Sequence, residues 1–193
     1  MSNAAFWNEF AKRSGRLAVW YRNGSARKAF DEIDELMAAN GHHFCFDIGH
    51  SDGNVGLFIT PEGDPKLAAA IDSLVRSAPL IPGWNIFGRR QKKDPYDFRA
   101  ILRHLYWLDP ADCRFKIEPG RPPQITLFVP EAQDITPQEQ ADFADVFLWH
   151  ALGEGNVMDA MIKPVVKKGI PDGKPLLSLD EFLAECDARF GFK

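Results

Sequence analysis

The sequence has few cysteines and no long apolar run. Its 193 residues include three cysteines, Cys45, Cys113 and Cys186, which are widely spaced and form no CxxC pair. An odd number of isolated cysteines is typical of reduced thiols and argues against a disulfide framework. No apolar run approaches membrane-spanning length, and the first residues lack the basic-then-apolar order of a secretion signal. These features predict a cytoplasmic protein that does not insert into a membrane.

The common signatures of catalysis and cofactor binding are also missing. Neither GxGxxG nor GxxxxGK[ST] occurs, so the sequence predicts no glycine-rich phosphate loop and no cofactor. No GxSxG elbow and no HExxH helix is found. The formal net charge of −4 gives no overall attraction to nucleic acid or to anionic lipid. The composition therefore disfavours a nucleic-acid-binding protein.

A regular succession of strand and helix patterns runs from residue 43 to residue 87. Apolar and other residues alternate over 44–49, with the period of two expected of a half-buried strand. An Asp-Gly turn joins this strand to the apolar run 55–59, which completes a hairpin. A helix capped by Asp64 follows, and a third strand begins at Trp84. This stretch predicts a strand, strand, helix and strand in that order.

The same order of elements occurs twice. Helix, strand, strand, helix and strand are expected from 26 to 87 and again from 96 to 166. The second strands are alike, since Leu-Phe-Ile-Thr-Pro-Glu at 57–62 is similar to Leu-Phe-Val-Pro-Glu at 127–131. We therefore expect a two-layer α/β (α+β) fold with a mixed, mostly antiparallel sheet and helices on one face. An internal duplication of an αββαβ unit is a hypothesis at this point, and one long sheet or two half-sheets would both fit.

These patterns divide the chain into three segments that we expect to form one compact domain. They are an N-terminal helical arm at 1–25, a first αββαβ half at 26–93, and a second αββαβ half with a C-terminal helix at 94–193.

Two groups of side chains are candidates for binding. Aromatic residues of the arm either pack on the body of the protein or form a partner surface, and these are Phe6, Trp7 and Phe10. The one basic cluster follows the third strand, and its members are Arg89, Arg90, Lys92 and Lys93. This cluster is a candidate anion patch, although a solvated loop is the favoured interpretation.

The densest group of metal-type ligands surrounds the first predicted strand. Alternation places His43, Cys45 and Asp47 on one face of that strand, with His50 near the turn. A structural metal site needs about four ligands in closed geometry, so we favour a polar strand face and predict no metal. Asp47, His43, His50 and, on the second hairpin, Glu118 are the candidates for general acid–base catalysis.

Several short segments resemble a family of uncharacterised bacterial cytoplasmic proteins. They are Phe6-Trp7, Asp47-Ile48-Gly49, the stretch 57–63, and the stretch 78–84. The likeness covers most of the chain and is strongest before Phe87. It consists of turns and strands rather than reactive groups, so it implies a bacterial cytoplasmic setting and no particular chemistry.

The sequence as a whole predicts a non-enzymatic protein-interaction or regulatory module with a protein partner or a second copy of itself. The alternative is an enzyme of unknown type with a polar site around His43, Asp47 and His50. A shallow apolar groove near Phe6 and Trp7 would favour the binding module. A deep pocket that converges on the polar residues would favour the enzyme.

Overall fold

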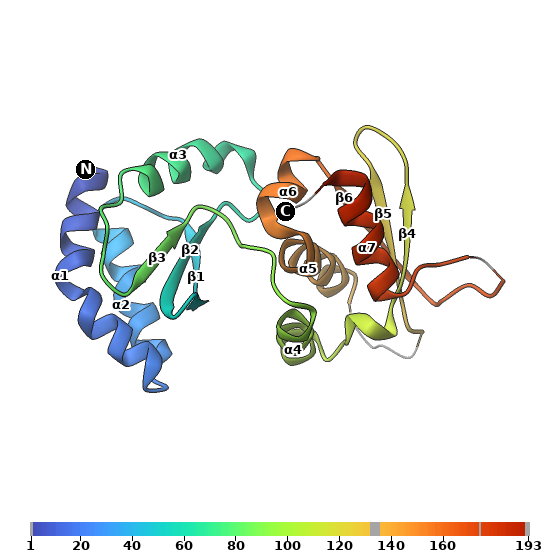
Figure 1. Ribbon diagram of the computed structural model, residues 1–193, viewed down its shortest axis with the longest axis horizontal. Helices are drawn as coiled ribbons and strands as arrows, with labels where there is room; N and C mark the ends of the chain where they lie inside the picture. The colour runs from blue at the N-terminus through green and yellow to red at the C-terminus, as the bar shows by residue number, and fades with distance from the viewer. Residues whose placement is uncertain (1, 132–135, 174, 192–193) are drawn as a thin grey trace. The chain divides into compact units, whose positions relative to one another are not determined.

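The computed structural model contains two small mixed sheets rather than one long sheet (Figure 1). It describes residues 2–131, 136–173 and 175–191. The chain divides into two compact units, Met1–Arg90 and Gln91–Lys193, and each of them holds one three-stranded sheet. The expected mixed α+β class is therefore confirmed.

The first unit begins with two helices and continues with a hairpin, a helix and a strand. Its elements are α1 (Asn3–Arg22), α2 (Ala26–Ala39), β1 (Cys45–Ser51), β2 (Asn54–Thr60), α3 (Pro65–Arg76) and β3 (Trp84–Phe87). The Asp64 side chain caps α3 by accepting a hydrogen bond from the main-chain N–H of Lys66 at 2.9 Å. β1 pairs with β2 in antiparallel fashion, and β3 pairs with β2 in parallel.

The aromatic residues of α1 lie in the core of the first unit. Phe6, Trp7 and Phe10 are all buried among residues of α2, α3 and the sheet. The Trp7 indole donates a hydrogen bond to the main-chain carbonyl of Leu74 in α3 at 2.8 Å. The partner surface considered for these three residues is therefore wrong, because burial in the unit's own core removes them from contact with a partner. The other interpretation, packing on the body of the protein, is the one observed.

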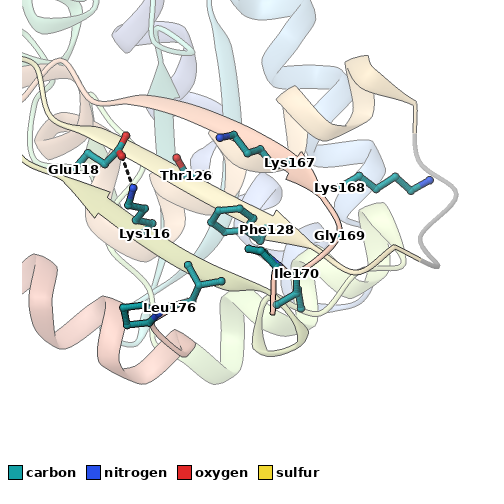
Figure 2. Close-up of a pocket in the computed structure, with 11 residues that line it drawn as sticks. Lys116, Glu118, Thr126, Phe128, Lys167, Lys168, Gly169, Ile170 and Leu176 are labelled. Carbon is teal, nitrogen blue, oxygen red and sulfur yellow. Dashed lines mark hydrogen bonds and ion pairs between the residues drawn. The ribbon is translucent and has the colours of Figure 1, made fainter. Parts of the chain in front are cut away.

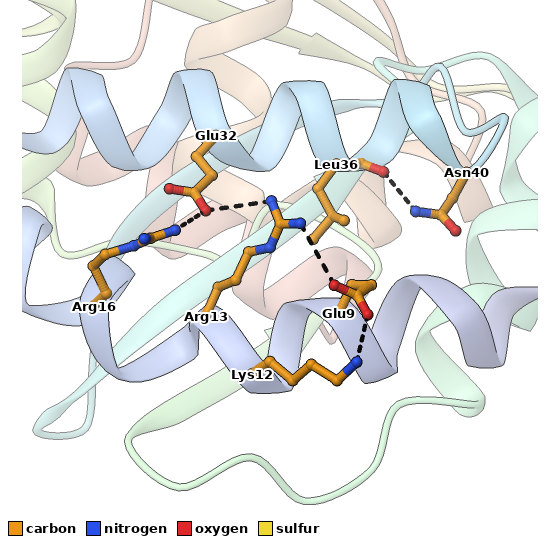
Figure 3. Close-up of polar contacts among 7 residues, drawn as sticks. All are labelled: Glu9, Lys12, Arg13, Arg16, Glu32, Leu36 and Asn40. Atoms are coloured by element: carbon orange, nitrogen blue, oxygen red, sulfur yellow. Dashed lines mark hydrogen bonds and ion pairs between the residues drawn. The ribbon is translucent and has the colours of Figure 1, made fainter.

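Ion pairs join α1 to α2 along their exposed sides (Figure 3). Glu32 of α2 accepts hydrogen bonds from both Arg13 and Arg16 of α1, and Glu9 binds Arg13 and Lys12 within α1. The Glu32 side chain is mostly buried between the helices, so two cations compensate the burial of its charge. This network links the two helices through Glu32.

The second unit has the same central order of elements but different flanking helices. Its elements are α4 (Pro95–Tyr106), η1 (Pro110–Asp112), β4 (Arg114–Glu118), β5 (Gln124–Val129), α5 (Pro137–Leu148), the π-helical turn η2 (Trp149–Gly153), α6 (Glu154–Asp159), β6 (Lys163–Lys168) and α7 (Leu179–Phe190). A capping box at Thr136 begins α5: the Thr136 hydroxyl accepts a hydrogen bond from the N–H of Glu139, and the Glu139 carboxylate accepts one from the N–H of Thr136.

A phenylalanine cluster forms the centre of the second core. The rings of Phe115, Phe147 and Phe182 lie within 4.6 to 5.8 Å of one another, centre to centre. Cys113 and Cys186 are buried in the same core as free thiols.

The two sheets share one topology. In each, an antiparallel hairpin is followed by a crossover helix and by a strand that pairs in parallel with the second strand of the hairpin. Half of the strand pairings are therefore parallel, more than the mostly antiparallel pattern expected, because the crossover helix returns the chain in the same direction. The repeated order of elements that the sequence predicts is visible in this topology.

Each sheet has one face against helices and one face away from them. Odd-numbered residues of β2 (55–59) and of β5 (125–129) belong to the two apolar cores. The alternate residues point to the opposite side, which we call the open face, because successive side chains of a strand point to opposite sides. Phe58 and Phe128 each lie on the open face of their own sheet. These two faces differ in what covers them.

Candidate functional site

A cavity of about 670 Å³ lies on the open face of the second sheet (Figure 2). All three strands contribute to its walls, together with residues 169–171 and 175–176 after β6. The strand residues that line it are Lys116, Glu118, Thr126, Phe128, Lys167 and Lys168. The volume is in the range of sites that hold small molecules.

Strand register brings these side chains together. Lys116 of β4 lies opposite Thr126 of β5, and Phe128 lies opposite Lys167 of β6. Glu118 follows Lys116 by two residues and so lies on the same face. The site thus forms because alternate side chains of each strand point to the same face, and because strands that are distant in the sequence pair with each other.

The segment after β6 closes one side of the cavity. It ends at Leu177, whose main-chain N–H and carbonyl each form a hydrogen bond of 2.9 Å with Phe115 at the outer edge of β4. Ile170 and Leu176 line the cavity from this segment. Gly169 begins it at a φ of +83°, a left-handed backbone conformation that favours glycine. The cavity therefore has apolar side walls in addition to its polar strands.

Positive charge predominates around the cavity. Three lysines line it, and Glu118 is the one carboxylate among the lining residues. Glu118 is paired with Lys116, and the hydrogen bond and charge of that lysine hold the pKa of Glu118 below its usual range. The Lys167 ammonium lies 6.0 Å from the centre of the Phe128 ring. The arrangement suits an anion that also has an apolar part.

The open face of the first sheet is covered by its own aromatic rings. Phe58 and Phe87 stack with their ring centres 4.9 Å apart and their planes within 7°. A Cβ built on Gly56 would lie 2.6 Å from the Phe58 ring, so this ring lies directly over the glycine. Phe58 and Phe128 occupy corresponding strand positions in the two sheets. Phe58 lies opposite Phe87, whereas Phe128 lies opposite Lys167. The repeated topology thus has an aromatic stack in one unit and a cavity in the other.

The predicted polar group around β1 does not converge. Cys45 and Asp47 lie on the open face of β1, whereas His50 lies on the other face, with its ring 5.2 Å from that of Tyr21. His43 is exposed and precedes the strand. In the described part of the chain, no three His, Cys, Asp or Glu side chains are grouped so that they could hold a metal ion. The candidate site of His43, Cys45, Asp47 and His50 is therefore not assembled, because even and odd strand positions point apart.

Asp47 instead has a structural partner. Its carboxylate accepts a hydrogen bond from Arg90 Nε at 2.7 Å, and the same guanidinium binds the Thr60 hydroxyl at 3.0 Å and the Glu62 carboxylate at 3.3 Å. The Arg90 side chain is only 10% exposed. These contacts join β1, the end of β2 and the last residue of the first unit.

The predicted anion patch is largely neutralised by ion pairs within each unit. Arg89 binds Asp72 at 3.0 Å, and Lys92 binds Asp187 at 2.7 Å. Arg90 is held as described above, while the main-chain N–H of Lys93 donates to the carbonyl of His150 at 2.8 Å. Three residues of the predicted anion patch, Arg89, Arg90 and Lys92, therefore have carboxylate partners within the protein, and the patch itself stays a prediction.

Of the predicted site residues, only Glu118 lines the cavity of the second unit. Lys116, Phe128 and Lys167 are not among the residues that the sequence predicts for a site. The alternation of Lys116 and Glu118 and the Lys167-Lys168 pair at the end of a strand are the available signals. They point to one site only when the strand register is known.

No protein-family model, curated protein or solved structure matched the chain. None of the helices that the described residues form is long and apolar enough to cross a membrane.

Proposed function

We propose that the protein is a non-enzymatic binding module that holds an anionic ligand in the cavity of its second unit. The observation that supports this proposal is the excess of lysine ammonium groups around a cavity with apolar walls. Lysine binds phosphate and carboxylate groups as a point charge, and a partly enclosed cavity strengthens such attraction relative to open water.

The chemistry of the lining favours binding over catalysis. Glu118 is the carboxylate that could act as a general acid or base there, and Lys116 lowers its pKa. A lowered pKa keeps the carboxylate ionised at neutral pH and makes it a poor proton donor. We therefore assign Glu118 the role of an ion-pair partner that orients Lys116 and competes with the ligand for it.

A cytoplasmic setting and a regulatory role are part of the same proposal. Cys45, Cys113 and Cys186 are free thiols, and Cys45 is exposed, which suits a reducing compartment. Binding of a charged metabolite would be the signal that such a module reads. A protein partner or a second copy of the chain stays a prediction, for which Leu80 at 96% and Trp107 at 86% exposure are the most accessible large apolar side chains among the described residues. Sedimentation velocity over a range of protein concentrations tests self-association.

Calorimetric titration with inorganic pyrophosphate tests the proposed anion site. We expect saturable binding that weakens as salt is raised, and a loss of about five- to tenfold in affinity for Lys167→Gln. Lys163→Gln is the matched control, because Lys163 is on the same strand but does not line the cavity. Equal effects of the two substitutions, or no binding by the parent protein at low salt, would overturn the proposal. Circular dichroism of each variant confirms that the fold is retained.

A further inference from the structure

We infer that the ligand of the second unit is a small aromatic anion, whose ring stacks on Phe128 while its charged group meets Lys116 and Lys167. This inference rests on the proposed anion-binding function and adds the chemical class of the ligand. It comes from the difference between the open faces of two sheets that share one topology.

In the first unit, a side chain of the unit itself supplies the second ring of the aromatic stack. In the second unit, we infer that the ligand supplies this second ring. On β2 and β3, the opposed residues Phe58 and Phe87 form a nearly parallel stack. On β5 and β6, the opposed residues are Phe128 and Lys167. The same strand positions therefore place an aromatic ring opposite a second ring in one unit and opposite a cation in the other.

Phe128 lies in the wall of the cavity, where it is 8% exposed. Phe128 lines the cavity, whereas its counterpart Phe58 lies against Phe87 and over Gly56. At the position of Gly56 the second sheet has Thr126, which also lines the cavity and offers a hydroxyl. A planar ligand on Phe128 would have Ile170 and Leu176 as apolar neighbours (Figure 2). Such a ligand would gain the offset stacking that aromatic pairs prefer.

The charge at the cavity determines what the ring must carry. Lys167 occupies the strand position that an aromatic residue has in the first unit. Lys116 lies on the edge strand at the other side of the sheet. A neutral aromatic molecule would leave these ammonium groups without a counterion other than Glu118. An aryl phosphate or an aryl carboxylate could both stack on the ring and pair with the cations. Both are aromatic anions, which is the chemical class that we infer.

Three probes separate the contributions of the ring and the anion. Phenyl phosphate carries both, cyclohexyl phosphate has the same charge and similar size without an aromatic ring, and inorganic phosphate has the charge alone. We expect phenyl phosphate to bind about fivefold more tightly than cyclohexyl phosphate and at least tenfold more tightly than inorganic phosphate. Methyl NMR resonances of Ile170 and Leu176 should show ring-current shifts with phenyl phosphate only.

Phe128→Leu keeps an apolar side chain at this position and removes the ring. It should abolish the difference between the two organic phosphates while the binding of inorganic pyrophosphate persists. If the two organic phosphates bind equally to the parent protein, or if only inorganic anions bind, the aromatic inference is wrong and the proposed anion-binding function stands. If pyrophosphate and all three probes fail to bind, both fall. Where Phe128→Leu disturbs folding, the comparison of probes on the parent protein still decides the inference.

Discussion

The indole nitrogen of Trp7 donates a hydrogen bond to the main-chain carbonyl of Leu74 at 2.8 Å, and this bond ties α1 to the last turn of α3. The Trp84 indole makes a similar bond, at 3.0 Å, to the carbonyl of Ser14 in α1. Two buried tryptophans therefore attach the first helix to the end of a helix and to an edge strand. The N-terminal helical arm that the sequence predicts at 1–25 therefore contributes its aromatic residues to the first core.

Substitution of Trp7 should therefore affect folding of the first unit. Trp7→Ala removes a fully buried side chain and leaves the Leu74 carbonyl without this donor, so we expect a loss of about 3–5 kcal/mol in the free energy of unfolding. Trp107→Ala is the matched control, since Trp107 is 86% exposed and should change stability by less than about 0.5 kcal/mol. Denaturant titration followed by circular dichroism measures both. Equal stabilities of the two variants would contradict the core role of Trp7.

The buried guanidinium of Arg90 should not be replaceable by an ammonium. Arg90→Lys keeps the charge but cannot reach Asp47, Thr60 and Glu62 with separate nitrogens, so we expect a loss of about 1–3 kcal/mol in stability. Arg27→Lys is the control, because Arg27 is an exposed residue with one i,i+4 partner. Thermal unfolding of the two variants compares them directly, and similar melting temperatures would show that the Arg90 network adds no net stability.

Local signals in the sequence were sufficient for most of the secondary structure. Alternation over 44–49 and the cap at Asp64 correspond to observed elements, because both depend only on neighbours in the chain. These features needed no knowledge of which elements meet in space.

The candidate site depended on information that the sequence pattern does not carry. Phe128 and Lys167 are about forty positions apart and meet only through the register of a parallel strand pair. The partners of the basic cluster were hidden for the same reason, since Asp72 and Asp187 come from distant helices. His50 was grouped with Asp47 by nearness in sequence, but an odd separation on a strand places the two on opposite faces.

The stability of the second unit should depend on pH through Asp109. This carboxylate receives two hydrogen bonds from Arg99, at 2.8 and 2.9 Å, and one from the main-chain N–H of Ala111 at 3.0 Å. The bonds from Arg99 are the main reason why the pKa of Asp109 is lowered. A carboxylate with a lowered pKa in the folded state contributes stability above its unfolded pKa of about 4, and this stability is lost as pH falls through the lowered value.

We therefore expect Asp109→Asn to cost about 1–2 kcal/mol at pH 7, with a smaller cost as the pH approaches 3. Asp159→Asn is the control, because Asp159 is an exposed residue for which no ion pair is found among the described residues. Urea titrations at several pH values give the difference in unfolding free energy between the parent protein and each variant. A cost of Asp109→Asn that does not change between pH 7 and pH 3 would contradict the assigned role of the Asp109 charge.

The three thiols should differ sharply in reactivity. Burial raises the pKa of Cys113 and of Cys186 to about 12, so neither forms a thiolate at neutral pH and neither is accessible to a reagent. Cys45 is exposed, and its pKa is raised by desolvation and by the neighbouring Glu62 carboxylate. In the native protein we expect a thiol reagent such as dithionitrobenzoate to modify one cysteine, more slowly than it modifies free cysteine, and to modify the other two only after unfolding.

Glu62→Gln tests the electrostatic part of this account. Removal of the negative charge should lower the pKa of Cys45, so the pH at which its labelling rate reaches half-maximum should move to lower values. Cys45→Ser identifies the reacting thiol, because it should abolish the native-state reaction while labelling under denaturing conditions still detects Cys113 and Cys186. A labelling profile that Glu62→Gln leaves unchanged would show that the Glu62 carboxylate does not raise the Cys45 pKa. A second thiol that reacts in the folded protein would contradict the burial of the other two cysteines.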